Sequence, residues 1–162
     1  MKIRLLLALV GLAISFAWPI SAQQKVTVDP QIAQQIRVLA SKYDEAINKH
    51  DAAAVAALYT QDGVRGTYNH GSFRGRKAIE KAYESWDFNT WHVGSHFTSV
   101  DRVTAVGNDV RSTGRWSCVF KNWEGADDDD GGYYSWVVVR DGDSWKIRRS
   151  NASGAGNRAS TN

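Results

Sequence analysis

The hydrophobic period of this chain changes near Asn89, and that change restricts the possible folds more than any other feature. Before Asn89, apolar residues recur at spacings of three and four, which is the period of amphipathic helices. After it, short runs rich in Val, Thr, Trp and Tyr alternate with Gly and Asp turns, a pattern typical of antiparallel strands. Helices followed by a strand meander predict an α+β domain, with the helices on one face of a curved antiparallel sheet.

Three helices are predicted before the change. The longest begins at Asp29-Pro30, which provides a capping side chain and a proline suited to the first turn. A short helix is expected over Ala52–Tyr59, a turn at Asp62-Gly63, a short strand over Arg65–Asn69 and a third helix over Arg76–Trp86. The buried stripe of the long helix is expected to consist of Ile32, Ile36, Leu39, Tyr43 and Ile47.

Four strands are predicted after the change, separated by short turns and by one long loop over Glu124–Gly132. A bent sheet that wraps around a long helix does not close its core completely, so we expect a concave apolar cavity between them. Such cavities are the usual sites for small molecules. The predicted strands are Trp91–Val106, Asp109–Asn122, Tyr133–Arg140 and Ser144–Ser150.

The N-terminus has the three parts of an export signal: a basic start, an apolar run over Leu5–Ala17 and small residues ending at Ala22. We expect residues 1–22 to be removed and the protein to be periplasmic or secreted, the alternative being an uncleaved anchor. A single domain is then predicted over 23–150, with a frayed tail over 151–162. No later apolar run is long enough to span a bilayer.

The charge balance argues against a nucleic-acid partner. The full chain has 20 Lys and Arg against 17 Asp and Glu, but two of the basic residues, Lys2 and Arg4, lie in the expected signal. The remaining balance is 18 − 17 = +1, so the basic surface that nucleic acids require has little compositional support.

Neither the lone cysteine nor the acidic run indicates a metal or disulfide site. Cys118 has no partner for an internal disulfide and is expected to be a buried strand thiol, with a nucleophilic role as the alternative. Asp127–Asp130 lacks the alternation and distal Glu of a calcium loop, so a solvated hairpin loop is expected. His92 and His96 lie about 13 Å apart on an extended strand, too far to share one ion. No cofactor is predicted.

Several segments resemble the SnoaL-like polyketide cyclases and ketosteroid isomerases, which belong to the cone-shaped superfamily of nuclear transport factor two. The resemblance covers about Ile32–Ser150 and implies a cone-shaped, mixed sheet wrapped around the long N-terminal helix. It also implies a homodimer formed through the outer face of the sheet. The segments that carry it are Tyr43–Asp51, Leu58-Tyr59, Asp62-Gly63, Gly75–Ile79 and Gly142–Ile147.

The resemblance assigns roles unevenly. Tyr43 occupies the place of the tyrosine that donates to the oxyanion in ketosteroid isomerases, but Thr67 stands where those enzymes have their basic Asp. A Thr hydroxyl does not abstract a carbon-bound proton at neutral pH. His96-Phe97 resembles the His-Phe pair of scytalone dehydratase, yet the second histidine expected on the next strand is missing from Arg111–Lys121.

His96 is the candidate general base, because imidazole titrates near neutrality; a surface or backbone-bonded histidine is the alternative. His92 is expected near the rim on the same strand face, and His70 at most at an entrance. Arg149 shares strand parity with Trp145 and Ile147 and is expected to point inward unless the strand bulges. The predicted catalytic residues are His96 and Tyr43, and the predicted ligand-binding residues are Tyr59, Thr67, Trp86, Trp116 and Arg149.

Two functions fit these residues. The first is a cofactor-free acid–base enzyme of the isomerase, cyclase or dehydratase type, acting on a small apolar or aromatic molecule; His96 would move the proton and Tyr43 would stabilise an oxyanion. The second is an exported module that binds a ligand or forms a homodimer without catalysis.

Overall fold

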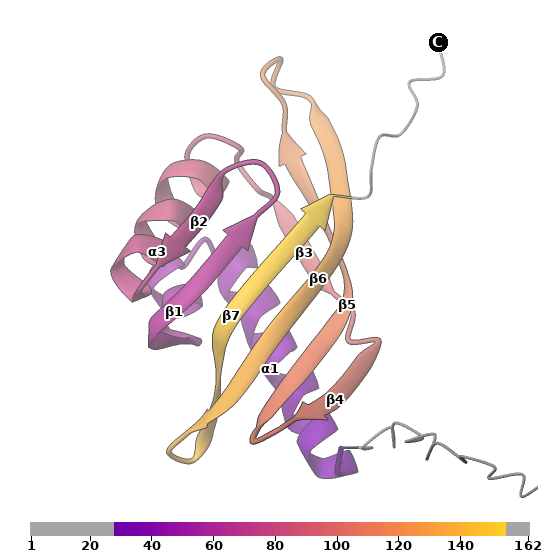
Figure 1. Ribbon diagram of the computed structural model, residues 1–162. Coiled ribbons are helices and arrows are strands. Elements are labelled where there is room, and N and C mark those ends of the chain that lie inside the picture. Colours follow the sequence, from indigo (N-terminus) through magenta and orange to yellow (C-terminus); the bar gives the residue numbers. More distant parts are fainter. Residues whose placement is uncertain (1–27, 155–162) are drawn as a thin grey trace, which may run out of the picture.

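The computed structural model describes residues 28–154 of the 162-residue chain. The signal predicted at 1–22 and the tail beyond Gly154 lie outside the described residues. Helix α1 (Pro30–Asn48) runs behind a strongly curved sheet, while the other helices stand at one edge (Figure 1). The predicted α+β class is confirmed, with helices covering one face of a bent sheet.

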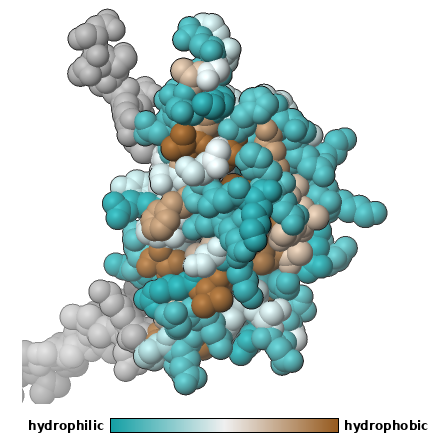
Figure 2. All heavy atoms as spheres, turned by 180° about the vertical axis from the view of Figure 1, so that it is seen from behind, coloured by the Kyte–Doolittle hydropathy of each residue, from teal (hydrophilic) through white to brown (hydrophobic). Residues whose placement is uncertain are grey.

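The long helix forms where its caps and apolar stripe predict it. Asp29 accepts a hydrogen bond from the backbone N–H of Gln31 at 2.7 Å, which satisfies one of the free donors of the first turn. Ile36, Leu39 and Ile47 are each at most 5% exposed and pack on the concave face of the sheet. The opposite side of the molecule from the view of Figure 1 is mainly hydrophilic, with separated hydrophobic areas (Figure 2).

The remaining elements of the described residues are the short helix α2 (Ala52–Ala57), α3 (Arg76–Ala82), the π-helical turn η1 (Tyr83–Phe88) and seven strands. The strands follow the order β2-β1-β7-β6-β5-β3, and β4 also pairs with β5. Among the strand pairs of residues 28–154, β1–β7 alone is parallel, so the sheet is mixed. The strands are β1 (Tyr59–Thr67), β2 (Gly71–Arg74), β3 (Ser95–Thr98), β4 (Arg102–Val106), β5 (Asp109–Lys121), β6 (Asp127–Asp141) and β7 (Ser144–Gly154).

Several predicted boundaries are wrong because strand pairing overrides local sequence signals. Tyr59 begins β1 instead of ending a helix, and Asp62-Gly63 lies at an irregularity within that strand. The stretch predicted as one strand over Trp91–Val106 contains two, β3 and β4, and the third helix changes to a π-helix after Ala82.

The long hairpin of β5 and β6 also extends further than predicted. The acidic run expected in a loop belongs to β6, because Asp127–Gly132 pair with Trp116–Lys121 on β5. Asn151–Gly154 are likewise a strand and not a frayed tail, since they pair with Gly132–Ser135 on β6. Within residues 28–154, none of the helices has the length and apolar character needed to cross a membrane.

Candidate functional site

A cavity of about 170 Å³ lies between α1 and the concave face of the sheet. Its walls come from α1, β1, η1, β3, β5, β6 and β7, and they are strongly aromatic. A cavity of about 150 Å³ is known to accept a benzene molecule. The volume therefore suits a ligand with one ring inside the cavity and further atoms in the mouth.

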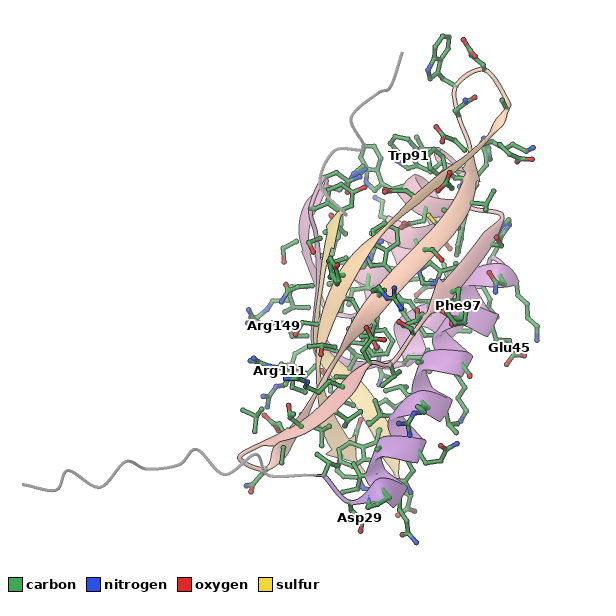
Figure 3. The ribbon with its side chains drawn as sticks, turned by 90° about the vertical axis from the view of Figure 1, so that its right-hand side faces the viewer. Asp29, Glu45, Trp91, Phe97, Arg111 and Arg149 are labelled. Carbon is green, nitrogen blue, oxygen red and sulfur yellow. The ribbon has the colours of Figure 1, made fainter. Side chains whose placement is uncertain are left out.

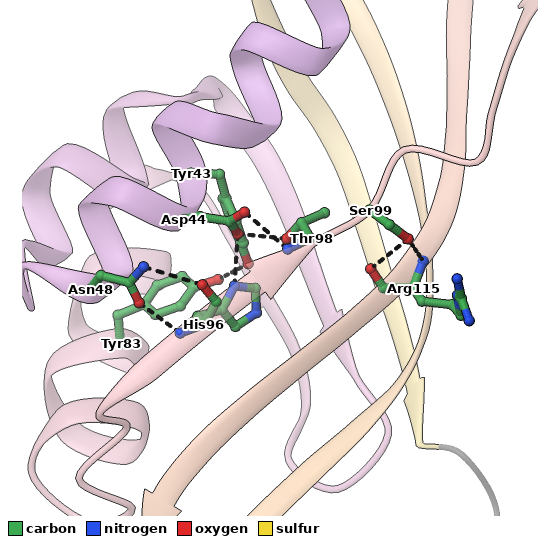
Figure 4. Close-up of polar contacts among 8 residues, drawn as sticks. All are labelled: Tyr43, Asp44, Asn48, Tyr83, His96, Thr98, Ser99 and Arg115. Carbon is green, nitrogen blue, oxygen red and sulfur yellow. Dashed lines mark hydrogen bonds and ion pairs between the residues drawn. The ribbon is translucent and has the colours of Figure 1, made fainter.

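His96 of β3 faces this cavity and is held by Asp44 of α1. The Nδ1 atom of His96 lies 2.8 Å from Oδ1 of Asp44, and the two side chains are 11% and 16% exposed (Figure 4). An ionised carboxylate only accepts hydrogen bonds, so Nδ1 carries the proton in the neutral ring and Nε2 carries the lone pair. No group within residues 28–154 forms a hydrogen bond with Nε2 of His96.

Asp44 and His96 are fixed by further hydrogen bonds between α1 and β3. Asp44 also accepts from the backbone N–H of Thr98 at 2.9 Å and from its hydroxyl at 2.7 Å. Asn48, one turn further along α1, accepts from the backbone N–H of His96 at 2.6 Å and donates to its carbonyl at 3.1 Å. The protein itself therefore sets the orientation of the imidazole. The same arrangement, in which one ring nitrogen donates to a carboxylate, orients histidines in metal sites and in acid–base sites.

Two tyrosine hydroxyls meet beside this pair. Tyr43 of α1 and Tyr83 of η1 share a short hydrogen bond, and the ring of Tyr43 packs edge-on against His96 with 5.6 Å between centroids (Figure 4). Burial raises the pKa of both tyrosines well above the ordinary value, so both stay protonated near neutrality. Two hydroxyl protons serve one shared hydrogen bond, and the hydroxyl of Tyr59 lies beside both rings, so the second proton can be donated either to Tyr59 or to a ligand.

The opposite wall holds a buried ion pair. Arg65 of β1 donates to Oδ1 of Asp87 at 3.0 Å, and its guanidinium carbon lies 4.1 Å from the ring centre of Tyr83. Burial raises the pKa of Asp87, and this outweighs the opposing effect of Arg65. The second oxygen, Oδ2, is buried and has no hydrogen-bond partner within residues 28–154.

The π-helical turn η1 brings side chains of this wall to the cavity. Its wider turn is visible in the hydrogen bond from the N–H of Asn89 to the carbonyl of Glu84, five residues earlier. Tyr83, Trp86 and Asp87 all line the cavity as a result. Such π-helical turns are frequent at functional sites.

Aromatic rings surround the mouth. Trp86 and Trp91 are 45% and 40% exposed, and His70 packs against both, with centroid distances of 4.7 and 6.2 Å. Trp116 of β5 stacks parallel to His96, with 6.4 Å between the ring centres. Tyr68 also stacks on Trp116, with 6.2 Å between the ring centres. The rim is thus suited to flat ligands.

Of the predicted site residues, five lie at the cavity and two do not. Tyr59 is completely buried in the core, where its hydroxyl bonds Ser150 at 2.8 Å, because it starts β1 instead of ending a helix. Arg149 is exposed and points away from the helix side (Figure 3). The register shift between Ile147 and Arg149 reverses the parity on which its inward orientation was predicted. The five at the cavity are Tyr43, Thr67, Trp86, His96 and Trp116.

Sequence reasoning missed Asp44, Arg65 and Asp87. One signal existed for the first: Asp44 and Asn48 are four residues apart on α1 and therefore share a face. His92, expected on the strand face of His96, lies outside β3 with a positive φ of 46° and is exposed. Burial, with help from Asp130, raises the pKa of Cys118 to about 12, which disfavours the nucleophilic alternative.

Comparison with solved structures finds the same fold in several proteins. One is a nuclear transport factor 2-like superfamily protein from Salmonella enterica serovar Typhimurium, with TM-score 0.68, 18% identity and coverage of 81% of this chain and 96% of that one. Another is a ketosteroid isomerase-like protein from Erwinia carotovora atroseptica, with TM-score 0.68, 20% identity and coverage of 80% and 100%. A hexachlorocyclohexane dehydrochlorinase matches with TM-score 0.67, 16% identity and coverage of 76% and 85%.

At these identities, the structural matches establish the fold alone. Comparison with curated protein sequences gives no match. The family profile described as a SnoaL-like domain matches residues 31–151, which is most of the described chain. Together with the cavity, this match supports a small-molecule-binding domain. The chain therefore belongs to the SnoaL-like family, and its fold is that of nuclear transport factor 2-like proteins.

Proposed function

We propose that this protein is a cofactor-free acid–base enzyme that acts on a small, flat and largely apolar molecule. The observation that carries the proposal is the 2.8 Å contact between Nδ1 of His96 and Asp44, which favours the neutral ring with its lone pair on Nε2, in a residue that lines the cavity. A base must lie within hydrogen-bond reach of the proton it removes, and the cavity is the space next to this nitrogen.

The proposed reaction begins with proton transfer from a carbon atom of the substrate to Nε2. The electrons of the C–H bond move towards a carbonyl oxygen or expel a leaving group, and the imidazolium that forms is stabilised by Asp44. The hydroxyl proton of the Tyr43–Tyr83 pair that is not used between these two residues donates a hydrogen bond to a developing oxyanion, in place of Tyr59. Return of the proton from His96 to another carbon gives isomerisation, whereas loss of the leaving group gives elimination.

The protonation of His96 can be tested without knowing the substrate. Nitrogen-15 NMR of the neutral histidine is expected to place the proton on Nδ1, and Asp44→Asn is expected to weaken that preference. A neutral His96 with its proton on Nε2 would contradict the proposal, because that nitrogen would then have no lone pair for a base.

The chemistry can be tested by following hydrogen exchange of carbon acids in D2O, with 2-tetralone and phenylacetone as probes. His96→Gln is expected to lower the exchange rate by at least about 100-fold, the usual scale of a general base. His92→Gln is the matched control, since His92 is exposed and outside β3. Equal exchange by the wild type and His96→Gln would remove His96 from the reaction.

Homodimerisation is a second part of the proposal. Phe97 and Tyr133 are 63% and 62% exposed, and Val119 is 39% exposed. They belong to the outer face of the sheet. Trp116 and Cys118 face the cavity, and successive residues of a strand face opposite sides, so Arg115 and Ser117 face outward. Phe97 pairs with Ser117 and Tyr133 with Arg115, and both therefore share that outer face. Such an apolar patch supports association. Tyr133→Glu is expected to shift the sedimentation of a dimer to that of a monomer.

Export is the third part, and it rests on the sequence of residues 1–22. Mass spectrometry of the protein recovered from its native compartment is expected to find a chain that begins at Gln23. An intact N-terminus on cytoplasmic protein would contradict both the cleavage and the periplasmic or secreted location.

A further inference from the structure

Asp87 has hydrogen-bonding capacity that the described part of the protein leaves unused. Its Oδ1 accepts from Arg65, but no donor within residues 28–154 reaches the buried Oδ2. A buried carboxylate oxygen without a hydrogen bond is costly, so it requires a partner from elsewhere. Asp87 lines the cavity, so a ligand there can supply the partner once the side chains that cover Oδ2 move aside.

The carboxylate is also held in place. Arg65 is 12% exposed in its side chain and lies between Asp87 and the ring of Tyr83, with a more distant contact to Phe73. The π-helical turn fixes the backbone of Asp87, and Tyr83 from the same turn bonds Tyr43 next to His96. Asp87 therefore has a defined position in the cavity that the proposed base also lines.

The charges around the cavity disfavour an anionic ligand. Arg65 is the only Lys or Arg among the lining residues described, and Asp87 already uses it. The other charged lining group is Asp130, which accepts a hydrogen bond from Tyr68 near the mouth. A ligand carboxylate would thus meet two carboxylates and no unpaired guanidinium or ammonium group.

We infer that Oδ2 of Asp87 is the anchor for a hydrogen-bond donor of the ligand, so that the cavity selects neutral ring compounds with a hydroxyl or N–H group over ethers and carboxylates. This inference deepens the proposed function, and rests on it in taking the same cavity as the substrate site. His96 would then act on an atom of the ligand that Asp87 has positioned from the opposite wall.

The test compares the binding of 4-fluorophenol and 4-fluoroanisole by fluorine-19 NMR titration at about pH 8, where the phenol stays protonated and the carboxylate form of Asp87 is favoured. The two ligands share the ring and the oxygen, but only the phenol donates. The wild type is expected to bind the phenol about tenfold more tightly, the usual effect of a hydrogen bond to a charged group. 4-Fluorobenzoate is expected to bind more weakly than either.

In Asp87→Asn the phenol-to-anisole preference is expected to fall to near equality, because an amide N–H can donate to the ether oxygen. The methyl group of the anisole affects both proteins alike, so its effect cancels when the affinity ratio of the wild type is compared with that of Asp87→Asn. Asp130→Asn is the matched control, since it makes the same change at the mouth and is expected to keep the tenfold ratio. A lost ratio in Asp130→Asn, or a retained one in Asp87→Asn, would overturn the assignment.

The wild-type ratio decides the question even if Asp87→Asn does not fold: near-equal affinities would mean that Oδ2 anchors no donor. His96→Gln separates this inference from the proposed function. It is expected to keep the phenol preference while losing hydrogen exchange. A phenol preference in a protein that exchanges no carbon acid would support the anchor and contradict the enzyme.

Discussion

The two walls of the cavity differ in how far the carboxylates they contain are satisfied by hydrogen bonds. On the wall of α1 and β3, Asp44 accepts three hydrogen bonds from His96 and Thr98, and the backbone of His96 is bonded on both sides by Asn48. On the wall of β1 and η1, Arg65 satisfies one oxygen of Asp87 and the other stays without a partner in the described chain. Both oxygens of Asp44 are therefore bonded before a ligand arrives, whereas Oδ2 of Asp87 gains its hydrogen bond from the ligand.

The largest effect is expected from removing the side chain of Asp44 from the wall of α1 and β3. Asp44→Ala leaves three donors without their acceptor and should lower the free energy of unfolding by about 3 kcal/mol. Denaturant unfolding measures this change. Glu45→Ala is the control, because Glu45 is exposed and bonds only Lys49; its midpoint should match the wild type. Equal midpoints for the two variants would mean that the first wall is not held by Asp44.

Removing the ring that stacks on His96 should mainly lower the affinity for the ligand. Trp116 lies at the cavity and stacks on His96, so Trp116→Ala is expected to weaken the binding of 4-fluorophenol about tenfold. Trp123→Ala is the control, since Trp123 is 92% exposed on the β5–β6 hairpin. Fluorine-19 NMR titration gives both affinities. A stronger loss in Trp123→Ala would place the ligand outside the cavity.

A smaller effect is expected at Tyr59, which starts β1 but does not line the cavity. Tyr59→Phe removes the hydroxyl that bonds Ser150 and should lower the free energy of unfolding by about 1 kcal/mol. Thermal unfolding together with the ligand titration tests this expectation, because the affinity for 4-fluorophenol should not change. A clear loss of affinity would return Tyr59 to the ligand site.

The smallest effect is a pH dependence of the free energy of unfolding, caused by Asp87 on the wall of β1 and η1. Because burial raises the pKa of Asp87, the folded protein binds this proton more tightly than the unfolded chain. The resulting stabilisation is fully present below the ordinary aspartate pKa, about 4, and disappears as the pH rises through the folded-state value. The unfolding free energy of the wild type minus that of Asp87→Asn should therefore fall with increasing pH. A difference that rises would mean that Arg65 outweighs burial.

The long helix was predicted well because its signals are local, whereas the ends of the two shorter helices were not. Asp29, Pro30 and the apolar stripe of α1 act within a few residues of one another, and α1 begins where they indicate. The strands were predicted less well. Whether Asp127–Gly132 form a loop or a strand depends on pairing with Trp116–Lys121, and nothing within the acidic run indicates that pairing.

The candidate site was predicted in part for the same reason. His96 and Tyr43 were identified from the resemblance and from their chemistry, and the structure brings their rings to 5.6 Å. Asp44 lies 52 residues from His96 in the sequence, so the contact between them depends on how α1 crosses β3. Arg149 failed because the irregularity next to it in β7 changes the side on which the following residues lie.

The sequence by itself determined the elements with local signals: the capped amphipathic helix, the strand-rich second half and a family resemblance that fixes the cone-shaped fold. Only the tertiary structure decided which polar groups meet. Hydrogen bonds between α1 and β3, and between β1 and η1, join residues that are far apart in the chain. Such contacts depend on helix crossing and strand register, and these are set by the packing of the whole sheet around α1.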